Sequence, residues 1–365
     1  MKKSLLALAV VFAFSAATAA TVYDKDGTSL AVGGRVQAVV YNGNNGNIPD
    51  HDAGLVNSAR MNIEGKTKVN DYLSVFAFSE WDMADGNKAA TGDTIYTRDQ
   101  YVGADFGSFG TLIAGKQFDA FYSVQEATDI FEDYGARLQG DTNAERRTGV
   151  FTYTYDNNGL FAKLGYQTAA DDVSVDGSNA NVEGGYSFAL GYTLDDVVFG
   201  PLSFKAGYGY ILGQDDKDEF GVASMKSFDN FKTVGASISW GTTDSGLYLA
   251  ALYEQNRQKI KEFGTNSSVT NITNGVELVA GYTFDNGLGV FTGYDVANYK
   301  VKFAGVKGDK AVYRRVPVYV NYNVCDSFNV WAEAEFDANS SIHSSSKKAD
   351  LETGTLLAAG ARYTF

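Results

Sequence analysis

Few side chains in this sequence could carry out nucleophilic, redox or metal chemistry. The 365 residues include two histidines, His51 and His343, and one cysteine, Cys325. Hydrolytic sites hold a histidine beside a serine or an acid, but both histidines lie in polar stretches typical of solvated loops. Cys325 has no histidine near it in sequence, and a single cysteine excludes an internal disulfide. The sequence therefore favours neither an enzyme nor a disulfide-stabilised fold.

Acidic side chains are numerous but form no recognisable metal motif. The acidic runs in 170–172 and 215–219 lack the D-x-D-x-D-G register of a calcium loop. We interpret them as solvated loop charge, with loose divalent-cation bridging to lipid phosphates as the alternative. The net charge of −14 argues against a nucleic-acid partner, because such binding depends on Lys and Arg neutralising phosphates. No cofactor is expected.

The first residues have the composition of a secretory signal peptide. Lys2 and Lys3 form a short basic region, residues 5–14 are all apolar, and residues 17–19 read Ala-Thr-Ala, a small-residue cleavage site. An uncleaved membrane anchor would need about 20 apolar residues, and this run is shorter. We therefore expect residues 1–19 to be removed, so that a single domain spans residues 20–365.

Strict alternation of apolar and polar residues dominates the rest of the chain. In residues 233–240, Val234, Ala236 and Ile238 alternate with Thr233 and small polar residues, which predicts a strand with one apolar face. Such segments recur sixteen times, at approximately 29–42, 55–68, 72–83, 94–106, 109–118, 146–156, 159–168, 183–194, 201–212, 228–240, 246–257, 274–284, 287–300, 311–324, 327–337 and 353–365.

These segments predict an all-β, transmembrane, antiparallel, up-and-down β-barrel of sixteen strands. Most are longer than the five or six residues usual in a β-sandwich and match the length of a tilted bilayer crossing. Short turns such as 285–287 alternate with long polar loops such as 258–273, as in outer-membrane barrels. The signal peptide is followed by no run of 18 apolar residues, which excludes a membrane helix. Simple alternation places Met61 and Tyr101 on the lipid face.

Two further stretches depart from a plain meander of strands. Residues 119–145 are the longest stretch without strand pattern, yet they contain Phe121, Tyr122 and Ile130, so we expect them to pack inside the lumen. The last residues, RYTF, continue an alternating strand up to Phe365. We expect that strand to close the barrel by pairing fully with the first one.

The chain resembles the trimeric, sixteen-stranded general porins of the Gram-negative outer membrane. The resemblance covers essentially all of residues 20–365 and is carried by TVYDKDGTSLAVGGRVQAVVY, SARMNIEGKTKV, YTRDQYVGADFGSFGTLIAGKQFDAFY, TDIFEDYG, DTNAERRTGVFTYTYDN and the terminal RYTF. In that family the third loop folds into the barrel and places acids opposite a ladder of basic residues on the wall.

Matching motifs carry the family's pore residues onto this sequence. The resemblance implies a basic wall of Arg35, Arg60, Arg98 and either Arg146 or Arg147. It implies constriction acids at Asp129, Glu132 and Asp133, with an inward acid at Glu80. The loop reads Glu-Asp-Tyr-Gly-Ala over 132–136 where the family often has Pro-Glu-Phe-Gly-Gly. The alignment of these acids with the family's acids is therefore open by one residue. Tyr363 and Phe365 match the family's C-terminal assembly signal.

The expected function is passive diffusion of small hydrophilic solutes and ions across the bacterial outer membrane, with a mild preference for cations. The resemblance implies a homotrimer surrounded by outer-membrane lipid and lipopolysaccharide. The alternatives are a substrate-selective porin for sugar or phosphate, an outer-membrane barrel enzyme, and a plugged adhesin or anchor. A plugged barrel should carry an extra domain or plug segment, and the sequence has none.

Overall fold

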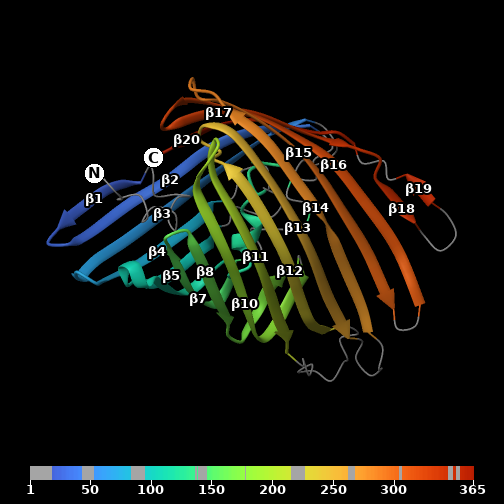
Figure 1. Cartoon of the computed structure of the whole chain (residues 1–365), viewed down its shortest axis with the longest axis horizontal. Helices are drawn as coiled ribbons and strands as arrows, with labels where there is room; N and C mark the ends of the chain where they lie inside the picture. Colours follow the sequence, from blue (N-terminus) through green and yellow to red (C-terminus); the bar gives the residue numbers. More distant parts are fainter. Residues whose placement is uncertain are drawn as a thin grey trace.

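The computed structural model describes a closed antiparallel β-barrel (Figure 1). It describes residues 19–42, 53–83, 95–135, 138, 146–176, 178–214, 227–261, 268–303, 306–343, 348–350 and 354–365. His51 lies outside these residues. No helix in the described part is long and apolar enough to cross a membrane.

Sixteen of the described strands form the wall, which confirms the predicted fold. In order they are β2 (Thr28–Tyr41), β3 (Gly54–Asn70), β4 (Leu73–Met83), β5 (Ile95–Asp105), β6 (Thr111–Gln117), β7 (Arg147–Asn157), β8 (Leu160–Gln167), β10 (Ser178–Val197), β11 (Gly200–Gly213), β12 (Ser227–Gly241), β13 (Gly246–Lys261), β14 (Ser268–Thr283), β15 (Leu288–Phe303), β16 (Val306–Cys325), β17 (Phe328–Asp337) and β20 (Leu356–Thr364). Each pairs with its neighbour, and β2 pairs with β20.

The closure differs from the expected full pairing of the first and last strands. Strand β20 pairs only with residues 35–41 of β2, and Phe365 exchanges two backbone hydrogen bonds of 2.9 Å with Gly34. The preceding part of β2, residues 28–32, pairs instead with the short strand β1 (Ala20–Lys25) through a turn at Asp26–Gly27. Strands β1 and β20 therefore share one edge of β2, because neither is long enough to cover it.

The wall has an apolar outer face and a polar inner face. On β12, Val234 and Ile238 are exposed while Thr233 and Ser237 are buried. A barrel in lipid needs this arrangement, since a Lys or Arg on the lipid face near mid-membrane costs about 2–4 kcal/mol. The alternation predicted from sequence is thus confirmed for this strand.

A bulge reverses the expected direction of Tyr101. Glu80 lies opposite Asp99, but Trp81 lies opposite Thr97, so Arg98 is an extra residue in β5. The extra residue shifts the parity of the strand. Tyr101 consequently lies opposite the inward Phe78 and stacks on it with 5.3 Å between ring centroids. The expectation that Tyr101 faces lipid was wrong.

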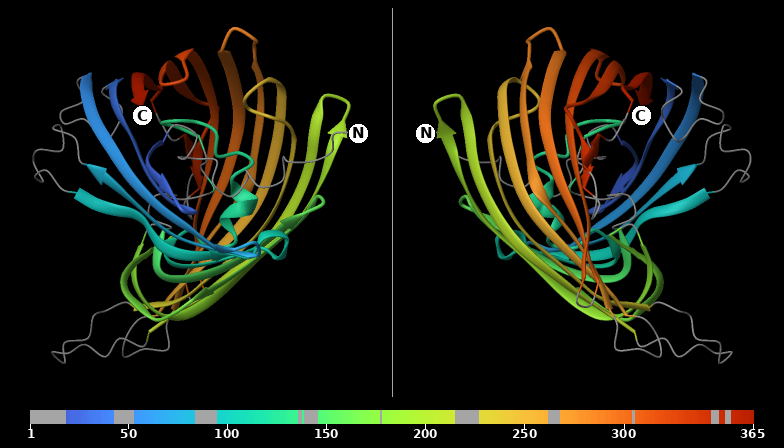
Figure 2. Two further views of the ribbon diagram at one scale, coloured as in Figure 1. Left: turned by 90° about the vertical axis from the view of Figure 1, so that its left-hand side faces the viewer. Right: turned by 90° about the vertical axis from the view of Figure 1, so that its right-hand side faces the viewer.

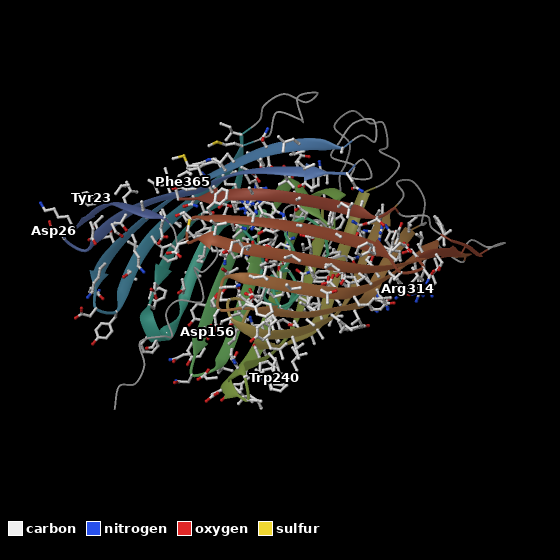
Figure 3. The ribbon with its side chains drawn as sticks, turned by 90° about the horizontal axis from the view of Figure 1, so that it is seen from above. Tyr23, Asp26, Asp156, Trp240, Arg314 and Phe365 are labelled. Carbon is white, nitrogen blue, oxygen red and sulfur yellow. The ribbon has the colours of Figure 1, made fainter. Side chains whose placement is uncertain are left out.

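Short turns and long connections lie at opposite ends of the barrel. The Asp26 turn and the long-loop part of β16 marked by Arg314 lie toward opposite ends in Figure 3. Short turns face the periplasm and long loops face the exterior in outer-membrane barrels. Three short strands extend the long-loop end: β9 (Ala170–Val175), β18 (Ser341–His343) and β19 (Lys348–Asp350).

The shared edge of β2 generates a prediction about Phe365. Deleting Phe365 should lower the yield of folded barrel, because the two backbone bonds to Gly34 contribute about 0.5–1.5 kcal/mol each. Phe365→Asp keeps these bonds but puts a charge in place of an exposed aromatic side chain at the edge of the apolar band, so it should also lower the yield. Folded and unfolded forms can be measured by gel mobility with and without heating. The variant Phe365→Tyr keeps the backbone bonds and the aromatic ring and should fold normally. Normal yield from the truncated chain would contradict the prediction, whereas conductance per folded channel should stay unchanged.

Candidate functional site

The described part of the long connection between β6 and β7, residues 118–135 and 138, lies against the inner face of the wall and is called the inner segment below. It contains the one-turn helix α1 (Tyr122–Gln125), which Figure 2 shows inside the ring of strands. Phe121 and Val124 are buried against Ala189 and Leu252. The inward Gly207 makes room for this contact, since a Cβ there would come within 3.0 Å of Val124. The apolar residues seen in the sequence are thus buried on the inner wall.

Inward carboxylates of the wall hold this inner segment by its backbone. Glu333 on β17 accepts hydrogen bonds from the backbone N–H groups of Glu132, Asp133 and Tyr134, at 3.0, 3.1 and 2.6 Å. One carboxylate therefore fixes three consecutive residues, including two of the predicted constriction acids.

Neighbouring strands add further anchors. Glu277 on β14 accepts hydrogen bonds from the Thr128 hydroxyl and the Leu138 N–H, both at 2.7 Å. On β13, Tyr248 donates to the Ala127 carbonyl at 2.6 Å, and Glu254 accepts from Gln125 at 2.9 Å. Because these anchors come from several strands, the inner segment is held along its length.

Three of the predicted basic residues cluster on β2, β3 and β5. Arg35 and Arg60 lie directly opposite each other. Arg60 approaches Asp82 at 3.4 Å, and Arg98 bonds Glu80 at 2.8 Å and Asp82 at 3.3 Å. The inward acid predicted at Glu80 is thus a direct partner of Arg98, and the structure brings these residues together.

The structure separates the two adjacent arginines that sequence could not distinguish. Arg147, which is 3% exposed, bonds Asp119 at 2.5 Å and ties the start of the inner segment to β7. Arg146 bonds Asp99 at 2.8 Å and lies 3.9 Å from the centre of the Phe118 ring. Arg146 therefore joins the basic cluster beside Asp99, whereas Arg147 is a buried anchor.

Sequence matching missed Arg362, although this residue bonds one of the predicted constriction acids. Its guanidinium bonds both oxygens of Glu132, at 2.7 and 2.5 Å, and Gln37 at 3.0 Å. This fork geometry is the strong form of an arginine–carboxylate pair. The available signal was parity: Arg362 alternates with the apolar Ala361 and Tyr363, so it had to face inward.

Each predicted acid on the inner segment has a defined partner. Asp129 accepts from the Tyr122 hydroxyl at 2.7 Å. Asp133 accepts from the Tyr41 hydroxyl and from the Trp331 indole N–H at 2.9 Å. Glu132 pairs with Arg362, as described above. The acids Asp129 and Asp133 are therefore held by neutral donors, while Glu132 is held by a cation.

These partners set the pKa of each acid. Burial raises the pKa of Asp129 and of Asp133 above its usual value, and the hydrogen bonds they accept oppose that rise. Burial acts in the same direction on Glu132, but the Arg362 hydrogen bonds and positive charge outweigh it and lower the pKa. Glu132 is thus the most firmly ionised of the three.

A second connection, which lies between the predicted strand segments 159–168 and 183–194, also folds onto the inner wall. Strand β9 pairs with the start of β10, and Val173 and Val175 pack against the inward Ile211 and Phe231 at the long-loop end. Gln258 on β13 donates to the Val175 carbonyl at 3.2 Å. Val173 and Val175, like Ala180 and Val182, do alternate with single polar residues, but each alternating run is too short to be told from a loop.

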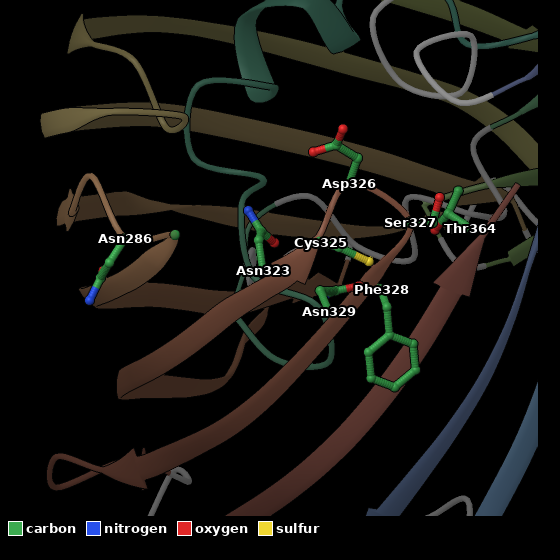
Figure 4. A pocket seen from close by; sticks show the side chains of 9 residues that line it. Asn286, Asn323, Cys325, Asp326, Ser327, Phe328, Asn329 and Thr364 are labelled. Atoms are coloured by element: carbon green, nitrogen blue, oxygen red, sulfur yellow. The ribbon is translucent and has the colours of Figure 1, made fainter.

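The remaining chemistry-bearing residues form no site in the described part of the chain. Cys325 is exposed and lines a shallow polar pocket between the 284–287 and 326–327 turns, with Asn323, Asp326 and Ser327 (Figure 4). Among the described residues no group of three His, Cys, Asp or Glu side chains could hold a metal ion.

Comparison with known sequences identifies the family. A sequence profile described as "Gram-negative porin" matches residues 6–260. Outer membrane porin PhoE of Enterobacter cloacae is 28% identical over the whole of both chains. Outer membrane porin C of the same species is 27% identical over the same extent. The chain is therefore similar to these porins from end to end.

Solved structures share the fold. The structure of a Salmonella typhi OmpF complex with daunomycin has a TM-score of 0.69 at 19% identity and covers 95% of this chain and 100% of its own. The anion-selective porin from Comamonas acidovorans has a TM-score of 0.61 at 17% identity, covering 93% and 100%. The chain thus belongs to the Gram-negative porin family and is a β-barrel channel protein of the bacterial outer membrane.

Proposed function

We propose that this protein is a general diffusion channel, without enzymatic activity, for small hydrophilic solutes and ions. In this proposal segment 119–145 folds into the lumen and narrows it. The observation that carries the proposal is the docking of the described part of this segment on inward carboxylates, with its Glu132 paired to Arg362 on the wall. A channel narrowed by fixed charges of both signs selects by width and by local field.

The balance of charge supports a mild preference for cations. Glu80, Asp82 and Asp99 compensate the arginines nearest to them on the wall. Asp129 and Asp133 have neutral partners, so their charge, when ionised, is not cancelled by a direct ion pair. Charges near a low-dielectric wall act more strongly than charges on an open surface. The preference should weaken as salt rises.

A substrate-selective channel for anions is the alternative that one observation favours. Arg35 lies opposite Arg60 and makes no ion pair with any described residue. Two facing arginines could hold an anionic solute. Saturation of single-channel current by added phosphate would support this alternative, and unsaturated conductance would support general diffusion.

The first prediction from this proposal concerns ion selectivity. Asp129→Asn with Asp133→Asn should shift the reversal potential in a salt gradient toward anions, because the acids facing the pore become neutral. Arg60→Gln with Arg98→Gln should shift it toward cations. The change Asp24→Asn with Asp26→Asn removes two charges at the β1–β2 turn and should do neither. If both pore variants formed channels with unchanged reversal potential, the proposed constriction would be wrong.

The second prediction concerns the anchoring of the inner segment. Glu333→Gln replaces a carboxylate that accepts three N–H bonds by an amide with one acceptor oxygen. Hydrogen bonds to a charged acceptor contribute about 1.5–3 kcal/mol each, so the segment should loosen. Single-channel recordings should show larger or noisier currents.

The matched control is Glu64→Gln on β3, which also removes one inward carboxylate. It should leave the current noise as in the wild type, because no described contact joins Glu64 to the inner segment. Equal noise in both variants would show that loss of an inward charge, and not loss of an anchor, is responsible.

The third prediction concerns maturation and assembly. We propose cleavage before Ala20 and a homotrimer, which is supported by OmpT of Vibrio cholerae, a similar structure that has been solved in a trimer form. Intact-mass measurement of membrane-purified protein should give a chain that begins at Ala20, and unheated gel electrophoresis should give a trimer band. A mass that includes Lys2, or a monomer as the sole species in mild detergent, would contradict this.

A further inference from the structure

Strand β9 and the first residues of β10, 178–182, form a hairpin with one apolar and one polar face. Val173 and Ala180 lie directly opposite each other, and both are buried against the inner wall. Ser174 lies opposite Asn179 on the other face, and Asn179 is exposed. The hairpin, which we call the mouth hairpin, therefore packs its apolar face on the wall and turns its polar face toward the water of the lumen.

The mouth hairpin crosses the inner face of the wall instead of extending it. Gln258, an inward residue of β13, donates a hydrogen bond of 3.2 Å to the Val175 carbonyl near the tip of the hairpin. Strand β13 is the third strand from β10 in the wall, and a strand spacing of about 4.8 Å puts it roughly 14 Å away. Asn271 on β14 donates to the Gln258 amide oxygen at 3.1 Å, which fixes the direction of the amide. The hairpin therefore lies across β11 and β12 and is bound at β13.

The mouth hairpin lies nearer the exterior than the inner segment does. On three neighbouring strands, the residue that contacts the hairpin is four positions closer to the long-loop end than a residue beside the inner segment. These pairs are Ile211 and Gly207 on β11, Phe231 and Gly235 on β12, and Gln258 and Glu254 on β13. At about 3.3 Å per residue and a tilt of about 40°, this offset corresponds to roughly 10 Å along the barrel axis. Solutes from the exterior therefore meet the hairpin first.

The contacts of the mouth hairpin hold it in place. Val175 and Val182 are 0% exposed, and Gln258, which bonds the tip, is 3% exposed. Mobile loops have few buried apolar contacts and solvated backbone bonds, and this hairpin has neither property on the face that it turns to the wall. It is therefore a fixed part of the inner wall.

We propose that the mouth hairpin is a second constriction of the channel, which limits the size of solutes before they reach the inner segment. A hairpin inside a closed wall occupies part of the cross-section of the lumen, and its polar face lets hydrophilic solutes pass along it. The inference rests on the proposed channel function and adds the level at which solutes from the exterior are first selected.

Exclusion of neutral polymers from single channels tests the proposal. Ala170 pairs with Val182, so Asn-Gly in place of residues 171–181 joins this pair by a two-residue turn. Polyethylene glycol of a size that the wild type excludes should enter the deletion variant from the long-loop side and lower its conductance. Entry from the short-turn side should stay as in the wild type, because the inner segment is met first from that side. Unchanged exclusion on the long-loop side would overturn the proposal.

Thiol labelling tests the position of the hairpin without shortening the chain. Asn179→Cys, made together with Cys325→Ser, puts one thiol on the polar face. A bulky methanethiosulfonate reagent added on the long-loop side should lower the single-channel conductance of this variant. The control is Ser245→Cys in the same background, which puts a thiol in an exposed short turn and should be labelled without loss of conductance. Complete labelling of the Asn179→Cys variant, verified by mass, with unchanged conductance would overturn the proposal.

Current noise separates the mouth hairpin from the inner segment. The two come close on β13, where Asn256 donates to the carbonyl of Leu138 at 3.2 Å. The deletion should leave the noise as in the wild type, because the bonds from the inner segment to Glu333 and Glu277 remain. Raised noise together with polymer entry from both sides would assign the exclusion to the inner segment and overturn the proposal. Saturation of the wild-type current by a solute would contradict general diffusion and leave the hairpin proposal standing.

Discussion

The structure depends on one constraint, which is that backbone polar groups facing lipid have no water to bond. Each must therefore pair within the sheet, and a sheet without edges is the solution. Closure between β2 and β20 satisfies this requirement. Once the wall is closed, apolar side chains must point outward and polar ones inward. The polar interior then provides the carboxylates, arginines and tyrosines that can hold a segment inside it.

The interior shows how one type of residue can serve two purposes. Glu333, Glu277 and Glu254 are wall acids that bind backbone or amide N–H groups of the inner segment. Glu132, on the segment itself, pairs with Arg362. The wall acids thus position the segment, while Glu132 of the segment pairs with an arginine of the wall. Anchoring and electrostatics are therefore coupled, since moving the segment would also move its charges.

Much of the wall could be predicted from sequence because alternation is enforced on every lipid-facing strand. All sixteen predicted segments overlap observed wall strands. The prediction failed where the alternation of apolar and polar residues does not report the direction of a side chain or the presence of a strand. An extra residue at Arg98 reverses the direction of Tyr101, and β1 and β9 are too short for a pattern to be visible. Motif matching identified Arg60 and Arg98 but not Arg362, because the only family motif that the terminal strand matches is the assembly signal.

The edge of β2 shared by β1 and β20 has a consequence for the order of folding. Residues near Ala20 and Phe365 pair with adjacent positions of one strand, although nearly the entire sequence separates them. Contacts of such separation form late, because the whole intervening loop must first be closed. Residues 35–41 of β2 therefore keep an unpaired edge until β20 arrives. During that interval the nascent barrel is open, and it needs either water or a protein partner to satisfy that edge.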